Sequence, residues 1–268
     1  MDFLVHLIFF FFMLLSSPSA AAVTVTACDQ CFRSKAAFFA TSTSLSGGAC
    51  GYGALAQTMY GGHFAAAGPS IFRSGLGCGA CFQIRCKRID LCSKAGTTIV
   101  VTDLHPDTKN ASDFVLSNRA FRSMAWPGKD VQVLQLGIAD VEYKRVPCIY
   151  RGQNLTFRVE EYSKFPYYLA IKILYQGGQT DILQADVGSV GQVNSWKPMK
   201  HNYGAIWDAS VTPKGPLQFR FKVQSGNRVQ YLYTNQVLPE YWKPGATYTS
   251  SVQISNVAAH GCSPCGSW

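Results

Sequence analysis

One short segment holds the residues of this chain that are best able to do chemistry. It reads Cys78-Gly-Ala-Cys-Phe-Gln-Ile-Arg-Cys86, and Cys92 follows, so four of the ten cysteines lie within 15 residues. Thiol groups at this density serve either as ligands of a metal ion or as partners in disulfide bonds. The cellular compartment decides between the two, because disulfides persist where the environment is oxidising.

The N-terminal residues indicate an oxidising compartment. Residues 3–15 are apolar apart from His6, and a stretch of small residues, 16–22, follows. An apolar run of this length is typical of a signal peptide and is shorter than a membrane span of about 20 residues. We therefore expect residues 1–21 to be a signal peptide, the mature protein to be secreted, and no membrane partner. The sequons at Asn110 and Asn154 fit this route and are candidate glycosylation sites.

In a secreted protein an even number of cysteines is expected to be paired in disulfides. Cys-x2-Cys spacing imitates the spacing of zinc ligands, but the histidines form no matching cluster. No βαβ pattern surrounds the pairs, as a thioredoxin-like redox site would require. We therefore expect neither a metal nor a cofactor. The spacing occurs three times, at Cys28/Cys31, Cys78/Cys81 and Cys262/Cys265.

The composition indicates a basic protein with many turns. Hydrophobic residues make up 47% of the chain, and the 24 glycines and 12 prolines favour many short strands. Removing residues 1–21 takes away one acid, Asp2, and no Lys or Arg, so the formal charge rises from +9 to +10. A basic secreted protein attracts polyanions, which in a cell wall are acidic polysaccharides such as pectin. The chain has no long Lys/Arg run or known motif for nucleic acid, so nucleic acid is not an expected partner.

The cysteines divide the mature chain into two halves near Cys148, because the next cysteine is Cys262. The second half alternates apolar and polar residues, which predicts a β-sandwich with strands at 155–159, 167–175, 217–223, 229–233 and 248–254. The first half predicts strands at 97–102 and 131–136. It also predicts a helix at 117–125, with Ser117 as its N-cap. Pro147 at the join favours two domains packed together.

Several motifs, taken in order, resemble plant expansins. They are Gly47-Gly-Ala-Cys-Gly-Tyr-Gly53, the segment Cys78–Cys86, Val101-Thr-Asp103, Leu116-Ser-x-x-Ala-Phe121 and Val146-Pro-Cys148. The opening Cys28-Asp-Gln-Cys31 and Ser34-Lys-Ala-Ala-Phe-Phe39 resemble the expansin-like A subgroup in particular. The resemblance implies an all-β fold: a six-stranded double-psi β-barrel over residues 22–148, then an immunoglobulin-like, carbohydrate-binding β-sandwich over 149–257. A C-terminal extension covers 258–268.

The resemblance also implies a set of disulfides that the spacing alone does not select. The implied pairs are Cys50–Cys78, Cys81–Cys148 and Cys86–Cys92. The remaining cysteines either pair locally or link the two termini, and the sequence leaves both alternatives open. They are Cys28, Cys31, Cys262 and Cys265.

Barrels of this kind resemble family-45 glycoside hydrolases, which invert and need one carboxyl group as acid and another as base. Ala40 matches the position of the base and cannot take a proton. Asp103 is expected to line the glycan groove, with His105 on the same side of an extended chain. A gap-free match places Val115 at the position of the acid. Asp113, two residues earlier and on the same face of an extended chain, is either a displaced acid or a surface residue.

The expected sandwich offers aromatic side chains that can stack on sugar rings. Alternation along 167–175 places Tyr167 on the inner side and Tyr168 on the outer side. Tyr203 matches an aromatic residue that expansins use for cellulose. The candidate polysaccharide-binding residues are Tyr167, Tyr168 and Tyr203. The residues expected in the core are Trp196, Trp207 and Tyr231.

These features favour a secreted, monomeric, non-enzymatic wall protein. Its expected partners are cellulose, xyloglucan and other hemicelluloses, and acidic pectin, and its expected effect is to loosen or modify the wall without hydrolysis. The first alternative is a weak endoglucanase that uses Asp113 and Asp103. The others are an inactive wall-binding or regulatory protein and a barwin-like defence module.

Overall fold

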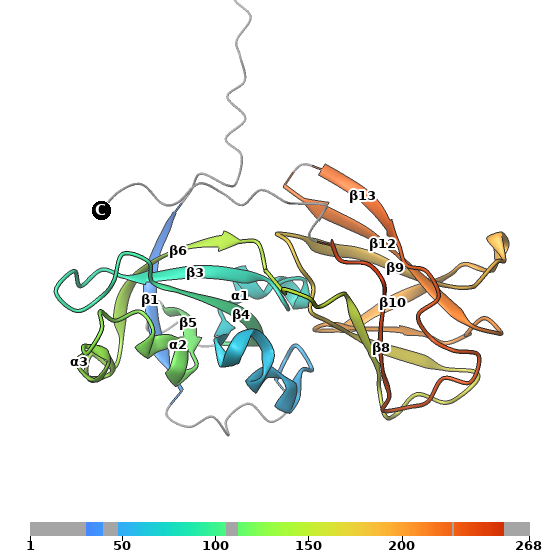
Figure 1. Ribbon diagram of the computed structural model, residues 1–268, viewed down its shortest axis with the longest axis horizontal. Coiled ribbons are helices and arrows are strands. Elements are labelled where there is room, and N and C mark those ends of the chain that lie inside the picture. The colour runs from blue at the N-terminus through green and yellow to red at the C-terminus, as the bar shows by residue number, and fades with distance from the viewer. Residues whose placement is uncertain (1–30, 40–47, 106–111, 227, 255–268) are drawn as a thin grey trace, which may run out of the picture.

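The computed structural model describes residues 31–39, 48–105, 112–226 and 228–254. It contains two all-β parts side by side, a closed barrel and a curled antiparallel sheet (Figure 1). The predicted signal peptide, Asn110, Ala40 and the C-terminal extension lie outside the described residues. No helix in the described part is long and apolar enough to cross a membrane.

The barrel closes in the strand order β1-β5-β2-β4-β3-β6. Strand β1 runs parallel to β5, and β2 runs parallel to β4, while the other neighbours are antiparallel. Because the sheet is closed, no strand edge is left unpaired. Phe114, Leu116 and Ile84 are among the fully buried side chains that fill it. The strands are β1 (Phe32–Phe38), β2 (Phe64–Ala67), β3 (Cys81–Cys86), β4 (Thr97–Leu104), β5 (Ser112–Leu116) and β6 (Ala139–Val146).

Among the described residues, three short α-helices accompany the barrel: α1 (Pro69–Phe72), α2 (Asn118–Arg122) and α3 (Asp130–Gln135). The Ser117 hydroxyl accepts a hydrogen bond from the Ala120 amide (3.1 Å), so the predicted N-cap of α2 is confirmed. The predicted strand at 131–136 is wrong, because these residues form α3. Val133 is buried there while Val131 is exposed, which is the one-sided burial of a surface helix.

The second part is an eight-stranded sheet in the order β13-β12-β9-β10-β11-β8-β7-β14. It curls into a sandwich because β10 pairs with β9 through residues 197–199 and with β11 through residues 200–203. Phe157 of β7 stacks on Phe219 and Phe221 of β12, with ring centroids 5.0 and 5.8 Å apart, so β7 and β12 face each other across the core. The strands are β7 (Thr156–Val159), β8 (Leu169–Leu174), β9 (Asp181–Ser189), β10 (Lys197–Tyr203), β11 (Ile206–Ala209), β12 (Leu217–Ser225), β13 (Arg228–Tyr233) and β14 (Thr247–Thr249).

In the described part of the chain, three disulfides with both cysteines described hold the barrel, and they have the pairing that the resemblance implies. They join Cys50 to Cys78, Cys81 to Cys148 and Cys86 to Cys92. Cys31 is also disulfide-bonded, whereas Cys28, Cys262 and Cys265 lie outside the described residues. Within the described part of the chain, no group of His, Cys, Asp and Glu side chains could hold a metal ion.

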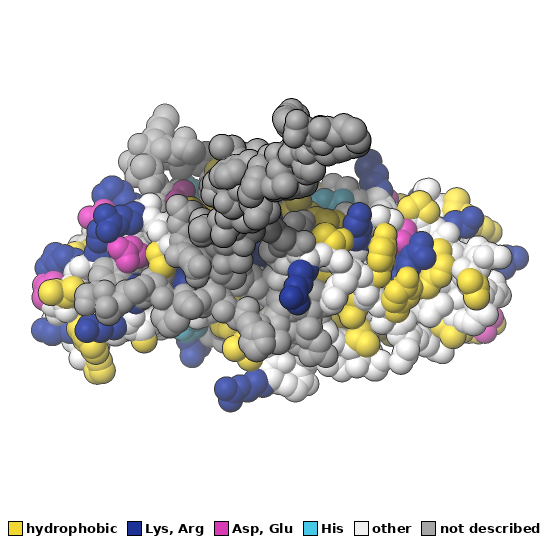
Figure 2. Space-filling model, turned by 90° about the horizontal axis from the view of Figure 1, so that it is seen from above, with side chains coloured by type: hydrophobic (Ala, Val, Ile, Leu, Met, Phe, Trp, Pro, Cys, Tyr) yellow, Lys and Arg dark blue, Asp and Glu magenta, His cyan; other side chains and the backbone are white. Residues whose placement is uncertain are grey.

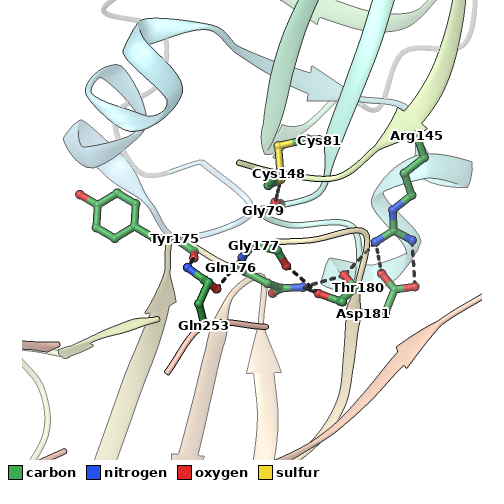
Figure 3. The surroundings of a disulfide bond; sticks show 10 residues. All are labelled: Gly79, Cys81, Arg145, Cys148, Tyr175, Gln176, Gly177, Thr180, Asp181 and Gln253. Carbon is green, nitrogen blue, oxygen red and sulfur yellow. Dashed lines mark hydrogen bonds and ion pairs between the residues drawn. A yellow bond between two sulfur atoms is a disulfide. The ribbon is translucent and has the colours of Figure 1, made fainter. Parts of the chain in front are cut away.

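An ion-pair cluster joins the two parts next to the Cys81–Cys148 disulfide (Figure 3). Asp181, at the start of β9, accepts hydrogen bonds from Arg73 (2.7 and 2.8 Å) and from Arg145 (2.6 and 3.2 Å) of the barrel. Burial alone would raise the pKa of Asp181, but the two arginines outweigh it and lower that pKa to about 2. The sandwich is therefore held against the barrel by a charged contact that is largely shielded from solvent.

Candidate functional site

Asp103 is held by the glycine-rich loop of residues 48–52, which precedes the 3-10 helix η2 (Gly53–Gln57). Its Oδ1 atom accepts hydrogen bonds from the Ala49 amide (2.6 Å) and from its neighbour, the Leu104 amide (2.8 Å). Gly48 has a positive φ of 60°, and a Cβ on it would lie 3.1 Å from the Thr102 carbonyl oxygen. Glycine at this position therefore lets the loop approach β4 closely enough to bind the carboxylate.

A β-bulge determines where Asp103 sits in the barrel wall. The register of β2 and β4 shifts between Ala65 and Ala66, so Ala66 pairs with Asp103 and Thr102 is skipped. On its other side Ala66 pairs with Val115 of β5. Asp103 and Val115 are therefore level with each other, two strand spacings or about 10 Å apart.

Asp113 lies elsewhere and has its own partners. It is two residues before Val115, which displaces it by about 7 Å along β5. The Tyr143 hydroxyl donates a hydrogen bond to the Asp113 Oδ2 atom (3.1 Å). The Asp113 amide donates a hydrogen bond to the Ser34 hydroxyl (3.1 Å). Burial and then the Asp113 charge raise the pKa of Tyr143, so this phenol stays a donor. The side chain level with Asp103 is therefore Val115, which cannot transfer a proton.

His105 follows β4 at the end of the described segment, and its amide donates to the Ala67 carbonyl oxygen (2.8 Å). This bond extends the pairing of β4 with β2 by one residue beyond Leu104. The backbone of His105 is thus fixed near Asp103, and its side chain is half-buried.

Tyrosines cover the outer face of the sheet that β7, β8 and β11 form. The rings of Tyr162 and Tyr168 have centroids 6.3 Å apart, and the Tyr168 hydroxyl is hydrogen-bonded to Asp208. Burial raises the pKa of Tyr162, Tyr168 and Tyr203, and the nearby carboxylates of Asp208 and Glu160 raise these values further. The rings therefore form one face of phenols that stay protonated.

A buried ion pair supports this face from below. Lys172 of β8 lies 3.0 Å from Glu160, and both side chains are almost completely buried although they point away from the sandwich core. Strand alternation did not identify Tyr162, because it lies in the turn between β7 and β8 and not in a strand. Its only sequence signal is that it precedes the Tyr167-Tyr168 pair by a few residues.

The face reaches the barrel at Tyr203. Tyr203 is 45% exposed, and a Cβ on Gly51 would lie 3.2 Å from the Tyr203 Cε2 atom. Gly51 belongs to the same loop as Ala49, which binds Asp103. A continuous surface therefore crosses the junction between the two parts. From the barrel to the sandwich it passes Asp103, the glycine-rich loop, Tyr203 and Tyr168.

The structure corrects three of the sequence-based placements and confirms a fourth. Tyr167 is 75% exposed and precedes β8, so the alternation that placed it inside does not extend to it. Tyr231 is half exposed, and Trp196 contacts Arg220 on an outer face, so neither lies in the core. Trp207 is buried in the core, as expected, and packs against His201 with a ring distance of 4.7 Å.

Two family models match the chain. A double-psi β-barrel model described as lytic transglycolase matches residues 64–143, and the expansin C-terminal domain matches residues 155–239. Together with the closed barrel and the curled sheet, these matches define a two-domain protein of the expansin type.

Comparison with known plant proteins specifies the group. Expansin-like A1 and Expansin-like A3 of Arabidopsis thaliana are 49% and 50% identical to the chain, covering 90% and 91% of it and 92% of each relative. Expansin-like A3 of Oryza sativa subsp. japonica is 43% identical over 90% of the chain and 88% of the relative. The chain therefore belongs to the expansin-like A group of the expansin family.

Solved structures support the fold. The apo expansin of Clavibacter michiganensis matches with a TM-score of 0.63 and 18% identity, covering 84% of this chain and 98% of its own. A mutant of that expansin, solved in complex with cellohexaose, matches with a TM-score of 0.62 and 17% identity.

Proposed function

We propose that this protein is secreted into the cell wall and binds β-glucan chains along the surface that runs from Asp103 to Tyr168. The contact between Tyr203 and Gly51 is the observation that carries the proposal, because it joins the aromatic face to the loop that holds Asp103. Pyranose rings have apolar faces that stack on aromatic rings, and hydroxyl groups that bond carboxylates and amides. A glucan chain lying on this surface would contact the carboxylate and amides near Asp103 and then the aromatic rings of the sandwich.

We propose further that binding is not coupled to hydrolysis. Val115 stands level with Asp103, and Asp113 is displaced and bonded to Tyr143. The base position matches Ala40, which lies outside the described residues. One general acid or base contributes about 10²–10⁴-fold to such a reaction, so loss of both would leave little turnover. The bound chain would instead lose contacts with its neighbours in the wall.

Family membership and the relatives support the location and the class of ligand. The bacterial expansin mutant was solved with cellohexaose, a soluble fragment of cellulose. Residues 1–21 as a signal peptide, the sequons at Asn110 and Asn154, and monomeric action remain parts of the proposal. Cellulose, xyloglucan and pectin are the wall polymers to test, and we keep 22–148 and 149–257 as the proposed domain bounds.

The proposal is tested by combining three measurements on the purified mature protein: cellulose pull-down, extension of heat-inactivated walls, and release of reducing sugar from β-glucan. We expect binding and extension without sugar release. Tyr203→Ala should weaken cellulose binding several-fold, whereas Tyr241→Ala, which removes an exposed tyrosine elsewhere on the sandwich, should not. Equal binding by Tyr203→Ala and the parent would refute the surface, and sugar release that Asp113→Asn abolishes would identify a hydrolase.

A further inference from the structure

A second group of aromatic residues lies on the opposite face of the sandwich. Tyr231 and Tyr233 of β13 are 50% and 55% exposed, and their cross-strand partners on β12 are Lys222 and Arg220. The alternate residues of β12 fill the core, so these four side chains point outward. Since β7 and β12 face each other across the core, this surface looks away from the face that carries Tyr168.

Figure 2 shows hydrophobic side chains gathered over the sandwich end of the molecule, with Lys and Arg side chains between them. The aromatic residues form a row in which the Tyr231 and Tyr233 centroids are 6.5 Å apart and the Tyr233 and Trp196 centroids are 6.1 Å apart. Each step is comparable to the length of one pyranose unit in an extended glycan. The two tyrosine rings would contact successive sugars of one chain, and Trp196 supports Tyr233 in an edge-to-face contact.

Arg220 holds two of the three rings in place. Its guanidinium lies 4.8 Å from the centroid of the Trp196 ring, and it is hydrogen-bonded to the Tyr233 side chain. Asp186 anchors the guanidinium from β9 through a 2.8 Å ion pair. A Cβ on Gly188 would lie 2.9 Å from the Trp196 ring, so the indole rests directly on the sheet. Tyr233 and Trp196 are therefore ordered before any ligand binds, which reduces the entropy lost on binding.

The tilt of the rings distinguishes between two kinds of glycan. Tyr231 and Tyr233 are inclined by 38°, and Trp196 is inclined by 74° to Tyr233. A flat crystal surface needs coplanar rings, whereas a single chain can twist to follow inclined ones. This face therefore suits one soluble chain and not the surface of crystalline cellulose.

The charges on this face indicate which kind of glycan it would bind. Arg220 is neutralised by Asp186, but Lys222, beside Tyr231, takes part in no ion pair among the described residues. Tyr, Trp and Arg side chains also occur at protein interfaces, so a second copy of the chain is an occupant that the test below examines. Lys222 complements a ligand that carries carboxylates.

We propose that Tyr231, Tyr233 and Lys222, supported by Trp196 and Arg220, form a second glycan-binding site for a single β-1,4-linked chain with uronate branches. The backbone of the chain stacks on the aromatic row, and a carboxylate pairs with Lys222. This site is separate from the surface that contains Tyr203, and its existence does not depend on the activity proposed for that surface.

The test is calorimetric titration of the full-length mature protein with glucuronate-branched and with neutral xylo-oligosaccharides. Replacing both tyrosines, Tyr231→Ala with Tyr233→Ala, should weaken binding of both oligosaccharides about tenfold, since two stacking rings are lost. The matching pair Tyr231→Phe with Tyr233→Phe keeps the rings and should bind like the parent. Lys222→Gln should remove the preference for the acidic oligosaccharide and leave binding of the neutral one unchanged.

Controls separate this site from the other surface. Tyr203→Ala should leave oligosaccharide binding at the second site unchanged, and the double alanine variant should keep its binding to crystalline cellulose. Parent-like affinity in the folded double alanine variant would overturn the proposal, as would absence of binding by the parent. A parent dimer in sedimentation that the double alanine variant abolishes would also overturn it, because the face would then be occupied by a second copy.

Discussion

Tyr203 of the sandwich lies against Gly51 of the barrel, so the aromatic face and the glycine-rich loop meet without an intervening side chain. Gly51 has a φ of +76°, and a Cβ there would lie 2.8 Å from the Ile206 Cδ1 atom and 3.2 Å from Tyr203. Only glycine combines this backbone conformation with this close approach. The continuity of the proposed glucan surface thus depends on one residue that has no side chain.

Gly51→Ala should weaken cellulose binding and lower the free energy of unfolding. The added methyl group pushes on Tyr203 and Ile206, and the positive φ costs about 1–3 kcal/mol for a residue other than glycine. Gly53→Ala is a matched control, because Gly53 has a φ of +56° but nothing within 4 Å of its Cβ position. Thermal unfolding and a cellulose pull-down of both variants check this. Equal loss of binding in the two would mean that strain, and not the contact, is responsible.

Asp181 should make stability depend on acid pH. Its pKa is lowered from 3.8 to about 2 in the folded protein, so its contribution is fully present above about pH 4 and is lost as the pH falls towards 2. A lowering of this size corresponds to about 2 kcal/mol. Asp181→Asn should remove the contribution, so denaturant unfolding at several pH values should show the two proteins differing at pH 6 and converging near pH 2. A constant difference across this range would contradict the prediction.

Asp103→Ala should loosen the glycine-rich loop. The amides of Ala49 and Leu104 would lose their shared acceptor, which costs about 1–3 kcal/mol where the groups stay buried. We expect faster hydrogen exchange of the Ala49 amide and weaker glucan binding. Asp113→Ala serves as a comparison, because it removes a partner of Tyr143 and leaves the loop untouched. If Asp113→Ala weakened glucan binding as strongly as Asp103→Ala, Asp103 would contribute no more to the binding surface than Asp113 does.

Two of the disulfides in the described part of the chain close loops of very different length and should differ in their effect on stability. Cys81 and Cys148 are 67 residues apart, so replacing both by serine should cost about 4 kcal/mol by the chain-entropy model. Cys86 and Cys92 are 6 residues apart, and their replacement should cost about 2 kcal/mol. Denaturant unfolding of the two double variants provides the measurement. A smaller loss for the long loop than for the short one would contradict the chain-entropy prediction.

The sequence predicted the secondary structure correctly where that structure depends on the pattern of neighbouring residues. The alternation of residues 217–223 predicts β12, and Ser117 marks the start of α2. It predicted the buried face of a strand less well, because an alternating pattern is compatible with either face being buried. Residues 229–233 alternate and do form β13, but alternation does not say which face is buried, and Leu232 turns inward while Tyr231 turns outward. The predicted strand at 248–254 is limited to Thr247–Thr249.

By itself, the sequence determined the all-β class of the sandwich, and its motifs indicated the family, because strand periodicity and motif order are properties of short segments. Only the tertiary structure decided that Val115 stands level with Asp103, since a bulge shifts the register there. Only the tertiary structure placed Tyr203 on Gly51 and two arginines on Asp181. The contacts of Tyr203 and Asp181 join residues more than 30 positions apart, so they arise from the packing of whole sheets, which no local pattern encodes.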